Sequence, residues 1–65
     1  MKNNFRVLLA KQRKKVSDVH KETGIAKSTL IALYYERTKN PETETLLKIA
    51  DYLGVTIDEL LTPEE

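Results

Sequence analysis

The sequence predicts an all-α fold, a compact bundle of five short helices, on three observations. Apolar residues recur at intervals of three and four along most of the chain. Two glycines and two prolines, Gly24, Pro41, Gly54 and Pro63, divide it into segments of helical length. No stretch of strand length alternates between apolar and polar residues. With 65 residues, the chain has room for a single domain over residues 1–65.

The first helix is predicted over residues 2–13. Its apolar face consists of Phe5, Leu8 and Leu9, which fall at i, i+3 and i+4. Lysine and arginine are concentrated at its end, where positive charge complements the helix dipole.

A second, short helix is predicted over residues 16–23, with Val16 and Val19 on its inner face. Either Lys15 or Ser17 is its N-cap. If the cap is Lys15, Asp18 is the third helical residue and can accept hydrogen bonds from the first turn. Gly24 ends this helix, because glycine readily adopts positive φ.

Three more helices are predicted, over residues 27–36, 43–53 and 56–61. The inner residues of the first of these are Leu30 and Leu33, and Pro41 makes residues 37–42 a turn. The helix over 43–53 has a wide apolar stripe, formed by Leu46, Leu47, Ile49, Ala50 and Leu53. The last helix begins at Thr56 with a capping box, Thr56-Ile57-Asp58-Glu59, and turns Ile57, Leu60 and Leu61 inward. Residues 62–65 are predicted to be a frayed tail.

The formal net charge of +1 conceals a strong asymmetry. Residues 1–40 contain ten basic and three acidic residues and carry +7. Residues 41–65 contain one basic and seven acidic residues and carry −6. Such a division points to an interaction surface on the first part of the chain.

Composition argues against several classes of protein. The chain has no cysteine, so disulfides and thiolate metal ligands are excluded. The lone histidine, His20, has no clustered ligands, and Ser28 has no partner at catalytic spacing, so no metal, cofactor or catalytic residue is expected and the chain is not predicted to be an enzyme. The apolar run over residues 7–10 is too short for a signal peptide core or a membrane span, which favours a cytoplasmic protein.

The segment from Val16 to Tyr35 has the spacing of a helix-turn-helix motif, in which two short helices flank a glycine-containing turn. It resembles that of the XRE-type helix-turn-helix regulators, the group of phage repressors and Cro proteins. The resemblance covers roughly residues 4–61. Its matching residues are Val19, Glu22-Thr23-Gly24-Ile25, Lys27-Ser28-Thr29-Leu30, Leu33-Tyr34, Lys39-Asn40-Pro41, Thr45-Leu46-Leu47-Lys48-Ile49-Ala50-Asp51-Tyr52-Leu53-Gly54-Val55 and Asp58-Glu59-Leu60-Leu61.

The resemblance implies a five-helix domain that binds double-stranded DNA and inserts the helix over 27–36 into the major groove. The residues that it implies for contact with bases are Ala26, Lys27, Ser28, Thr29 and Ala32. Those that it implies for contact with phosphates are Ser17, Tyr35, Arg37, Thr38 and Lys39.

The chemistry of these side chains agrees with such roles. Lys27 can reach the acceptors of guanine, Ser28 can bond to several bases, and Ala32 offers a methyl group to thymine. The amides of residues 27–29 lie at a helix N-terminus, which favours anions. Arg37 and Lys39 add positive charge beside them.

Three residues depart from the pattern of the family. His20 stands where a small residue is usual, so it must tilt outward or the helix crossing must open slightly. Ala26 replaces a capping serine, at a cost of about 1 kcal/mol. Glu36 stands where many members have glycine, so the loop over residues 36–40 is expected to be longer or differently shaped.

The function predicted from the sequence is that of a transcriptional regulator, specifically a repressor, which binds a palindrome as a homodimer. The expected dimer face lies in the acidic half, at Tyr52, Val55, Leu60 and Leu61, because DNA repels that half. No small-molecule ligand is expected, since the chain has no room for a sensing domain. The alternative is a protein-interaction module, such as an antitoxin-like regulatory partner with the same fold.

Overall fold

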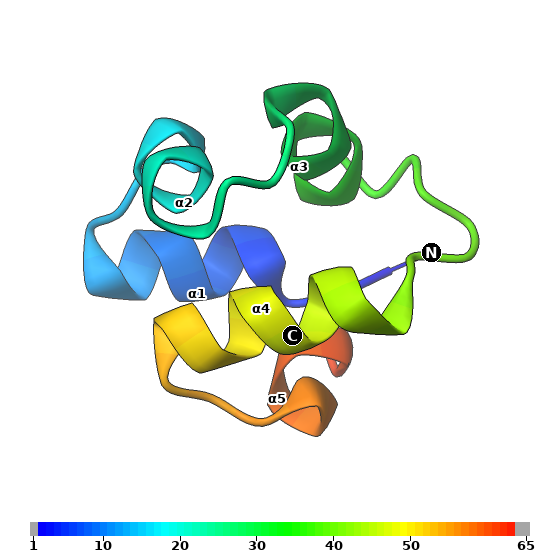
Figure 1. Cartoon of the computed structure of the whole chain (residues 1–65). Coiled ribbons are helices and arrows are strands. Elements are labelled where there is room, and N and C mark those ends of the chain that lie inside the picture. Colours follow the sequence, from blue (N-terminus) through cyan, green and yellow to red (C-terminus); the bar gives the residue numbers. More distant parts are fainter. Residues whose placement is uncertain (1, 64–65) are drawn as a thin grey trace.

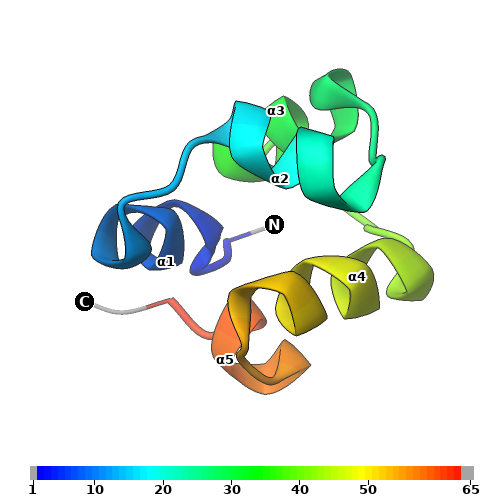
Figure 2. The ribbon, with the colours of Figure 1, turned by 60° about the vertical axis from the view of Figure 1, so that its left-hand side comes forward.

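The computed structural model describes residues 2–63 and confirms the all-α prediction. These residues form five helices and no strand: α1 (Phe5–Gln12), α2 (Val16–Thr23), α3 (Lys27–Tyr34), α4 (Thr43–Leu53) and α5 (Ile57–Leu61). The pair α2 and α3 lies at one end of the molecule, at the top of Figures 1 and 2, and α5 lies at the opposite end, with α1 and α4 between them. The arrangement therefore places α3 and α5 at opposite ends of the molecule.

All five helices contribute to one hydrophobic core. Its buried members are Phe5, Leu8, Leu9, Val19, Leu30, Leu33, Leu46, Ile49, Ala50, Leu53 and Leu60. The prediction that Leu47 faces inward is wrong, because its side chain is 53% exposed. Successive helical residues are rotated by about 100°, which turns Leu47 away from the stripe that contains Leu46 and Ile49.

The N-terminal segment corrects the predicted start of α1, which begins at Phe5 and not at residue 2. The Phe5 amide donates to Asn3 Oδ1 at 2.9 Å, and Asn3 Nδ2 donates to the Leu33 carbonyl at the end of α3, also at 2.9 Å. The Asn4 amide donates to the Leu60 carbonyl in α5 at 2.7 Å. These bonds hold residues 3 and 4 between α3 and α5. If α1 continued through these residues, the bonds would be lost.

The C-terminus of α1 is capped without glycine. Arg13 has a φ of 55°, in the left-handed region. Its amide donates to the Ala10 carbonyl at 3.2 Å, and the Lys14 amide donates to the Leu9 carbonyl at 2.9 Å, which is the Schellman arrangement. A left-handed residue with a Cβ costs roughly 1 kcal/mol, so this end of α1 is strained.

The predicted ends of α4 and α5 are confirmed. Gly54 has a φ of 70° and closes α4, while the Val55 amide donates to the Ala50 carbonyl at 3.0 Å. Thr56 Oγ1 accepts from the Glu59 amide at 3.0 Å, and the Thr56 amide donates to Glu59 Oε1 at 3.3 Å, so the capping box forms. Of the tail predicted over residues 62–65, Thr62 and Pro63 lie outside the helices, and Glu64 and Glu65 lie outside the described residues.

No helix in the described part of the chain is both long enough and apolar enough to cross a membrane.

Candidate nucleic-acid interface

The N-terminus of α2 is capped by Lys15 and not by Ser17, which decides between the two predicted caps. The Lys15 amide donates to Asp18 Oδ2 at 2.8 Å, so Asp18 accepts from the N-cap amide and completes a capping box. Ser17 is left exposed as the second residue of the helix. Its hydroxyl is therefore available on the surface at the positive end of the α2 dipole.

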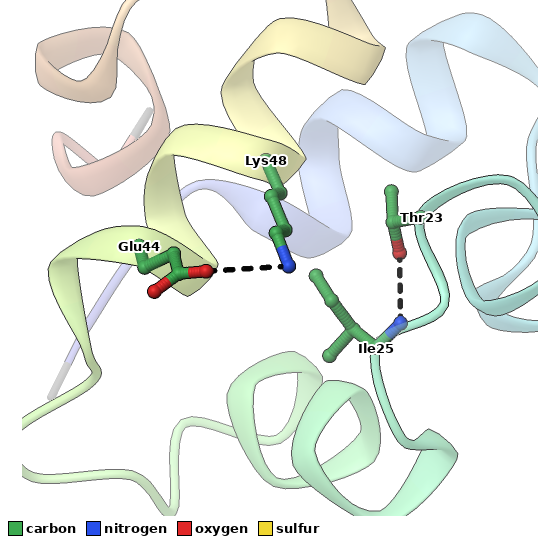
Figure 3. Close-up of polar contacts among 4 residues, drawn as sticks. All are labelled: Thr23, Ile25, Glu44 and Lys48. Atoms are coloured by element: carbon green, nitrogen blue, oxygen red, sulfur yellow. Dashed lines mark hydrogen bonds and ion pairs between the residues drawn. The ribbon is translucent and has the colours of Figure 1, made fainter.

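The turn between α2 and α3 is fixed by glycine and by the Thr23 hydroxyl. Gly24 has a φ of 76°, and its amide donates to the His20 carbonyl at 2.9 Å. Thr23 Oγ1 donates to the Val19 carbonyl at 2.6 Å and accepts from the Ile25 amide at 3.2 Å, a bond drawn in Figure 3. One side chain therefore satisfies backbone groups on both sides of the turn, which holds α3 at a defined angle to α2.

His20 adds a third bond to this turn. Its ring is half-buried, and Nδ1 lies 2.7 Å from the Ile25 carbonyl oxygen. Because a carbonyl only accepts, the hydrogen of this bond must reside on Nδ1. The departure from the small residue of the family is thus accommodated by a partly buried ring that ties α2 to Ile25 in the turn before α3.

The predicted base-contacting residues gather at the start of α3. Ala26, Lys27, Ser28 and Thr29 are all exposed, and Ala32 is half-buried one turn later. The first bond of the helix runs from the Leu30 amide to the Ala26 carbonyl at 3.1 Å, and the Ala26 side chain makes no cap bond. The amides of residues 27–29 therefore precede the first hydrogen bond of the helix, an arrangement suited to an anion or a base edge.

Ala26→Ser should raise the free energy of unfolding by about 1 kcal/mol, because a hydroxyl at this position can accept from the first-turn amides. The backbone of Ala26, with φ −56° and ψ 138°, already has the extended conformation of a cap. Urea unfolding followed by circular dichroism measures the gain. Ala26→Val supplies side-chain bulk without an acceptor and should not stabilise. An equal gain from both would contradict the capping explanation.

The C-terminus of α3 lies two residues earlier than predicted. α3 ends at Tyr34, and Glu36 has a φ of 59°. The Glu36 amide donates to the Leu33 carbonyl at 3.1 Å, and the Arg37 amide donates to the Ala32 carbonyl at 2.8 Å. Glu36 thus takes the left-handed position for which glycine is favoured, and Glu36 Oε2 accepts from the Asn3 amide at 3.0 Å.

The residues predicted to contact phosphates fall into two groups. Tyr35 and Arg37 lie together beyond α3. The Tyr35 side chain is 58% exposed, and the Arg37 guanidinium carbon is 5.2 Å from its ring centre. Lys39 is exposed and Thr38 half-buried in the same loop. Ser17 belongs to the separate group at the start of α2.

Sequence reasoning overlooked the cations beside Ser17. Lys14 and Lys15 occupy the connection between α1 and α2, and Lys15 is exposed. The basic run Arg13-Lys14-Lys15 directly before a helix entered the sequence analysis as part of the +7 charge, as a complement to the dipole of α1 and, for Lys15, as a candidate N-cap, but not as a phosphate contact.

The predicted dimer face is reduced by the burial of Leu60. Its side chain is 0% exposed, so it offers no surface to a second copy. Tyr52, Val55 and Leu61 are half-buried and pack against the core. The Lys14 ammonium lies 4.3 Å from the ring centre of Tyr52, which gives this tyrosine an intramolecular partner.

The comparisons with known proteins agree with this geometry. A family model described as a Cro/C1-type HTH DNA-binding domain matches residues 4–65. The chain belongs to this family. The family is one of DNA-binding domains and not of enzymes, as the sequence had suggested.

A solved structure shows the same fold. It comes from Bacteroides fragilis and is described as a "putative DNA-binding protein". It is 22% identical to this chain, with a TM-score of 0.81, and the match covers 92% of this chain and 95% of the other. No curated protein matches the sequence.

The surface charge of this Cro/C1-type domain follows the same division as its sequence. The exposed cations of the first three helices accompany the helix-turn-helix, while Glu44, Asp51, Asp58 and Glu59 are exposed on α4 and α5. In α4 the Lys48 ammonium lies 3.5 Å from a carboxylate oxygen of Glu44, and both side chains are drawn in Figure 3. Lys48, the one basic residue of the acidic half, is thus paired with Glu44. The acidic surface around this pair would repel a polyanion such as DNA.

Proposed function

We propose that this DNA-binding domain is a cytoplasmic repressor that reads a specific sequence in the major groove of double-stranded DNA. The observation that carries the proposal is the exposed, uncapped N-terminus of α3. There Lys27, Ser28 and Thr29 present side chains and amides together. Lysine and serine are suited to hydrogen-bond base edges, and the amides are suited to a phosphate.

Phosphate contacts would hold α3 in register. Tyr35 and Arg37 lie at the C-terminal end of α3, and Ser17 lies at the start of α2. Contacts from two elements fix both the position and the tilt of a recognition helix. Lys39 extends the first group along the loop.

The size of the domain supports binding as a homodimer. One copy measures 28 × 24 × 18 Å, so two copies in contact can place equivalent α3 helices about 34 Å apart, one turn of the duplex. Tyr52, Val55 and Leu61 remain the candidate contacts between copies. A repressor of this kind acts by occupying its site, which needs no further domain.

Selection from a random duplex pool tests this function directly. Enrichment of a palindrome with half-sites one turn apart would support a sequence-specific dimer. Enrichment without symmetry would contradict the dimer alone. Retention of all sequences equally would contradict sequence-specific reading, and absence of duplex binding would favour the protein-interaction alternative.

Lys27→Ala should weaken binding to the preferred duplex by about 1–3 kcal/mol and relax the preference at one position of each half-site. The reason is that Lys27 is exposed at the start of α3, where base edges would lie. Competition binding against duplexes substituted at each position measures the change. Lys21→Ala removes an exposed lysine from α2 and serves as the matched control. Uniform weakening on all duplexes would make Lys27 a phosphate contact instead.

A further inference from the structure

A groove of about 530 Å³ lies beside α3 and shares one residue, Tyr35, with the proposed DNA contacts. We call it the α1–α3 groove. It is lined by α1, by the connection to α2 with the first residue of α2, and by the end of α3 with the residue that follows it: Arg6, Leu9, Ala10, Lys14, Lys15, Val16, Ile31, Tyr34 and Tyr35. Its volume falls within the range of small-molecule sites, about 300–1,000 Å³.

The wall of the groove is apolar and aromatic. The described part of the chain exposes three large apolar side chains, and two of them line this groove: Ile31, 39% exposed, and Tyr35, 58% exposed. Tyr34 and Tyr35 contribute rings whose centres lie 5.0 Å apart at an interplanar angle of 72°. Contact of this apolar surface with water is unfavourable, so an apolar group that covers it lowers the free energy.

The charged residues that line the groove are all cations. They are Arg6, Lys14 and Lys15, and no carboxylate is among the lining residues. The Lys14 ammonium is directed to Tyr52, 4.3 Å from the ring centre, which leaves Arg6 and Lys15 as the cations for a ligand. The nearby Asp18 carboxylate is engaged by the Lys15 amide at 2.8 Å and belongs to α2, outside the lining.

We propose that the α1–α3 groove binds a small amphiphilic anion, with a flat apolar body against Ile31, Tyr34 and Tyr35 and a carboxylate near Arg6 and Lys15. Charge alone would suit the phosphates of a duplex equally well. The apolar wall decides between them, because a hydrated sugar-phosphate backbone cannot cover it, whereas an aromatic or aliphatic acid can.

Such a ligand would act on DNA binding. Ile31 belongs to α3, and Tyr35, which directly follows α3, is a proposed phosphate contact, so an occupied groove and a bound duplex would compete. This consequence rests on the proposed function, but the binding of the ligand does not. The two are therefore measured separately.

The test is a titration of the whole, ¹⁵N-labelled chain with 2-naphthoate, followed by amide chemical shifts at low salt. A ligand of about 13 non-hydrogen atoms should bind with a Kd on the order of 0.1–1 mM. The shifts should saturate and concentrate at Ala10, Val16, Ile31 and Tyr35. The neutral analogue 2-naphthalenemethanol should bind about fivefold more weakly, because it lacks the negative charge that Arg6 and Lys15 attract.

Variants test the two cations separately from the apolar wall of the groove. Arg6→Gln with Lys15→Gln should weaken 2-naphthoate about fivefold and leave the neutral analogue unchanged. Ala10→Phe should fill the groove and weaken both compounds. Lys21→Gln, which removes a lysine outside the lining, should change neither. The amide spectrum of each variant shows that it is folded.

Three results would overturn the proposal: shifts that do not saturate, equal affinity for the acid and the alcohol, and no loss in the Arg6→Gln, Lys15→Gln variant. A duplex displacement assay is then a separate readout. If 2-naphthoate binds the groove but does not displace DNA, the site stands and its competition with the duplex is refuted. If no duplex binds at all, the proposed function fails while the titration still decides the groove.

Discussion

Asn3→Ala is expected to lower the free energy of unfolding by about 2–6 kcal/mol. Asn3 is buried, and its side chain satisfies two backbone groups that water does not reach, the Phe5 amide and the Leu33 carbonyl. Alanine leaves both without their partner, and each buried group that loses its bond costs about 1–3 kcal/mol. A domain of this size has a total stability on the order of 3–10 kcal/mol, so the loss should be visible in any unfolding curve.

Asn4→Ala provides the matched control. Asn4 is also buried and is the adjacent residue, but its Oδ1 has no hydrogen-bond partner within the described part of the chain. Its amide bond to the Leu60 carbonyl is kept in the variant. The cost should therefore be no more than about 1 kcal/mol. Urea unfolding of the two variants checks this order, and equal losses would show that burial, and not the bonds of Asn3, supports the segment.

The parts of the fold that were predictable from sequence are those whose signals are local. Gly24 and Gly54 end their helices because each sits where positive φ is required. Thr56 and Glu59 form their capping box within four residues. The spacing of Leu30 and Leu33 identified the inner face of α3, and with it the exposed residues at the start of that helix.

The parts that were missed depend on contacts between distant segments or on residues that act against their propensity. Asn3 starts α1 late because it reaches the end of α3, thirty residues away in sequence. Arg13 and Glu36 adopt left-handed backbone although neither is glycine, so nothing in their identity announces the helix ends. Each is held by a Schellman pair of bonds, which offsets a cost of roughly 1 kcal/mol.

The surface around α3 likewise has one part that local sequence signals predict and one part that depends on contacts between distant segments. The region for DNA contact followed from helical spacing and from charge along the chain. The α1–α3 groove did not, because Ile31 and Tyr35 meet Arg6 and Lys15 only when α1 and α3 are packed. A sequence of 65 residues suggested little space for a ligand, but α1 and the end of α3 leave an open groove between them.

The affinity for the preferred duplex is expected to fall steeply with salt. Each copy can neutralise roughly three to five phosphates, so a dimer should show a slope of about −5 to −9 in log affinity against log salt concentration. Between 50 and 200 mM salt this corresponds to a loss of about 10³–10⁵-fold, because released counterions dominate the binding free energy. Fluorescence anisotropy at four or five salt concentrations measures the slope.

Two variants that each remove one positive charge show which face of the molecule produces that slope. Arg37→Gln removes a cation from the loop after α3 and should make the slope of the dimer shallower by about 2, one phosphate for each copy. Lys48→Gln removes a cation that is paired with Glu44 on the acidic half, and it should leave the slope unchanged. Both variants lower the net charge equally, so a nonspecific effect of charge would shift both slopes alike. That outcome, or a wild-type slope near zero, would contradict binding through the helix-turn-helix face. If DNA binds at that face, the slope depends on the cations that contact phosphates there, because each such contact releases counterions.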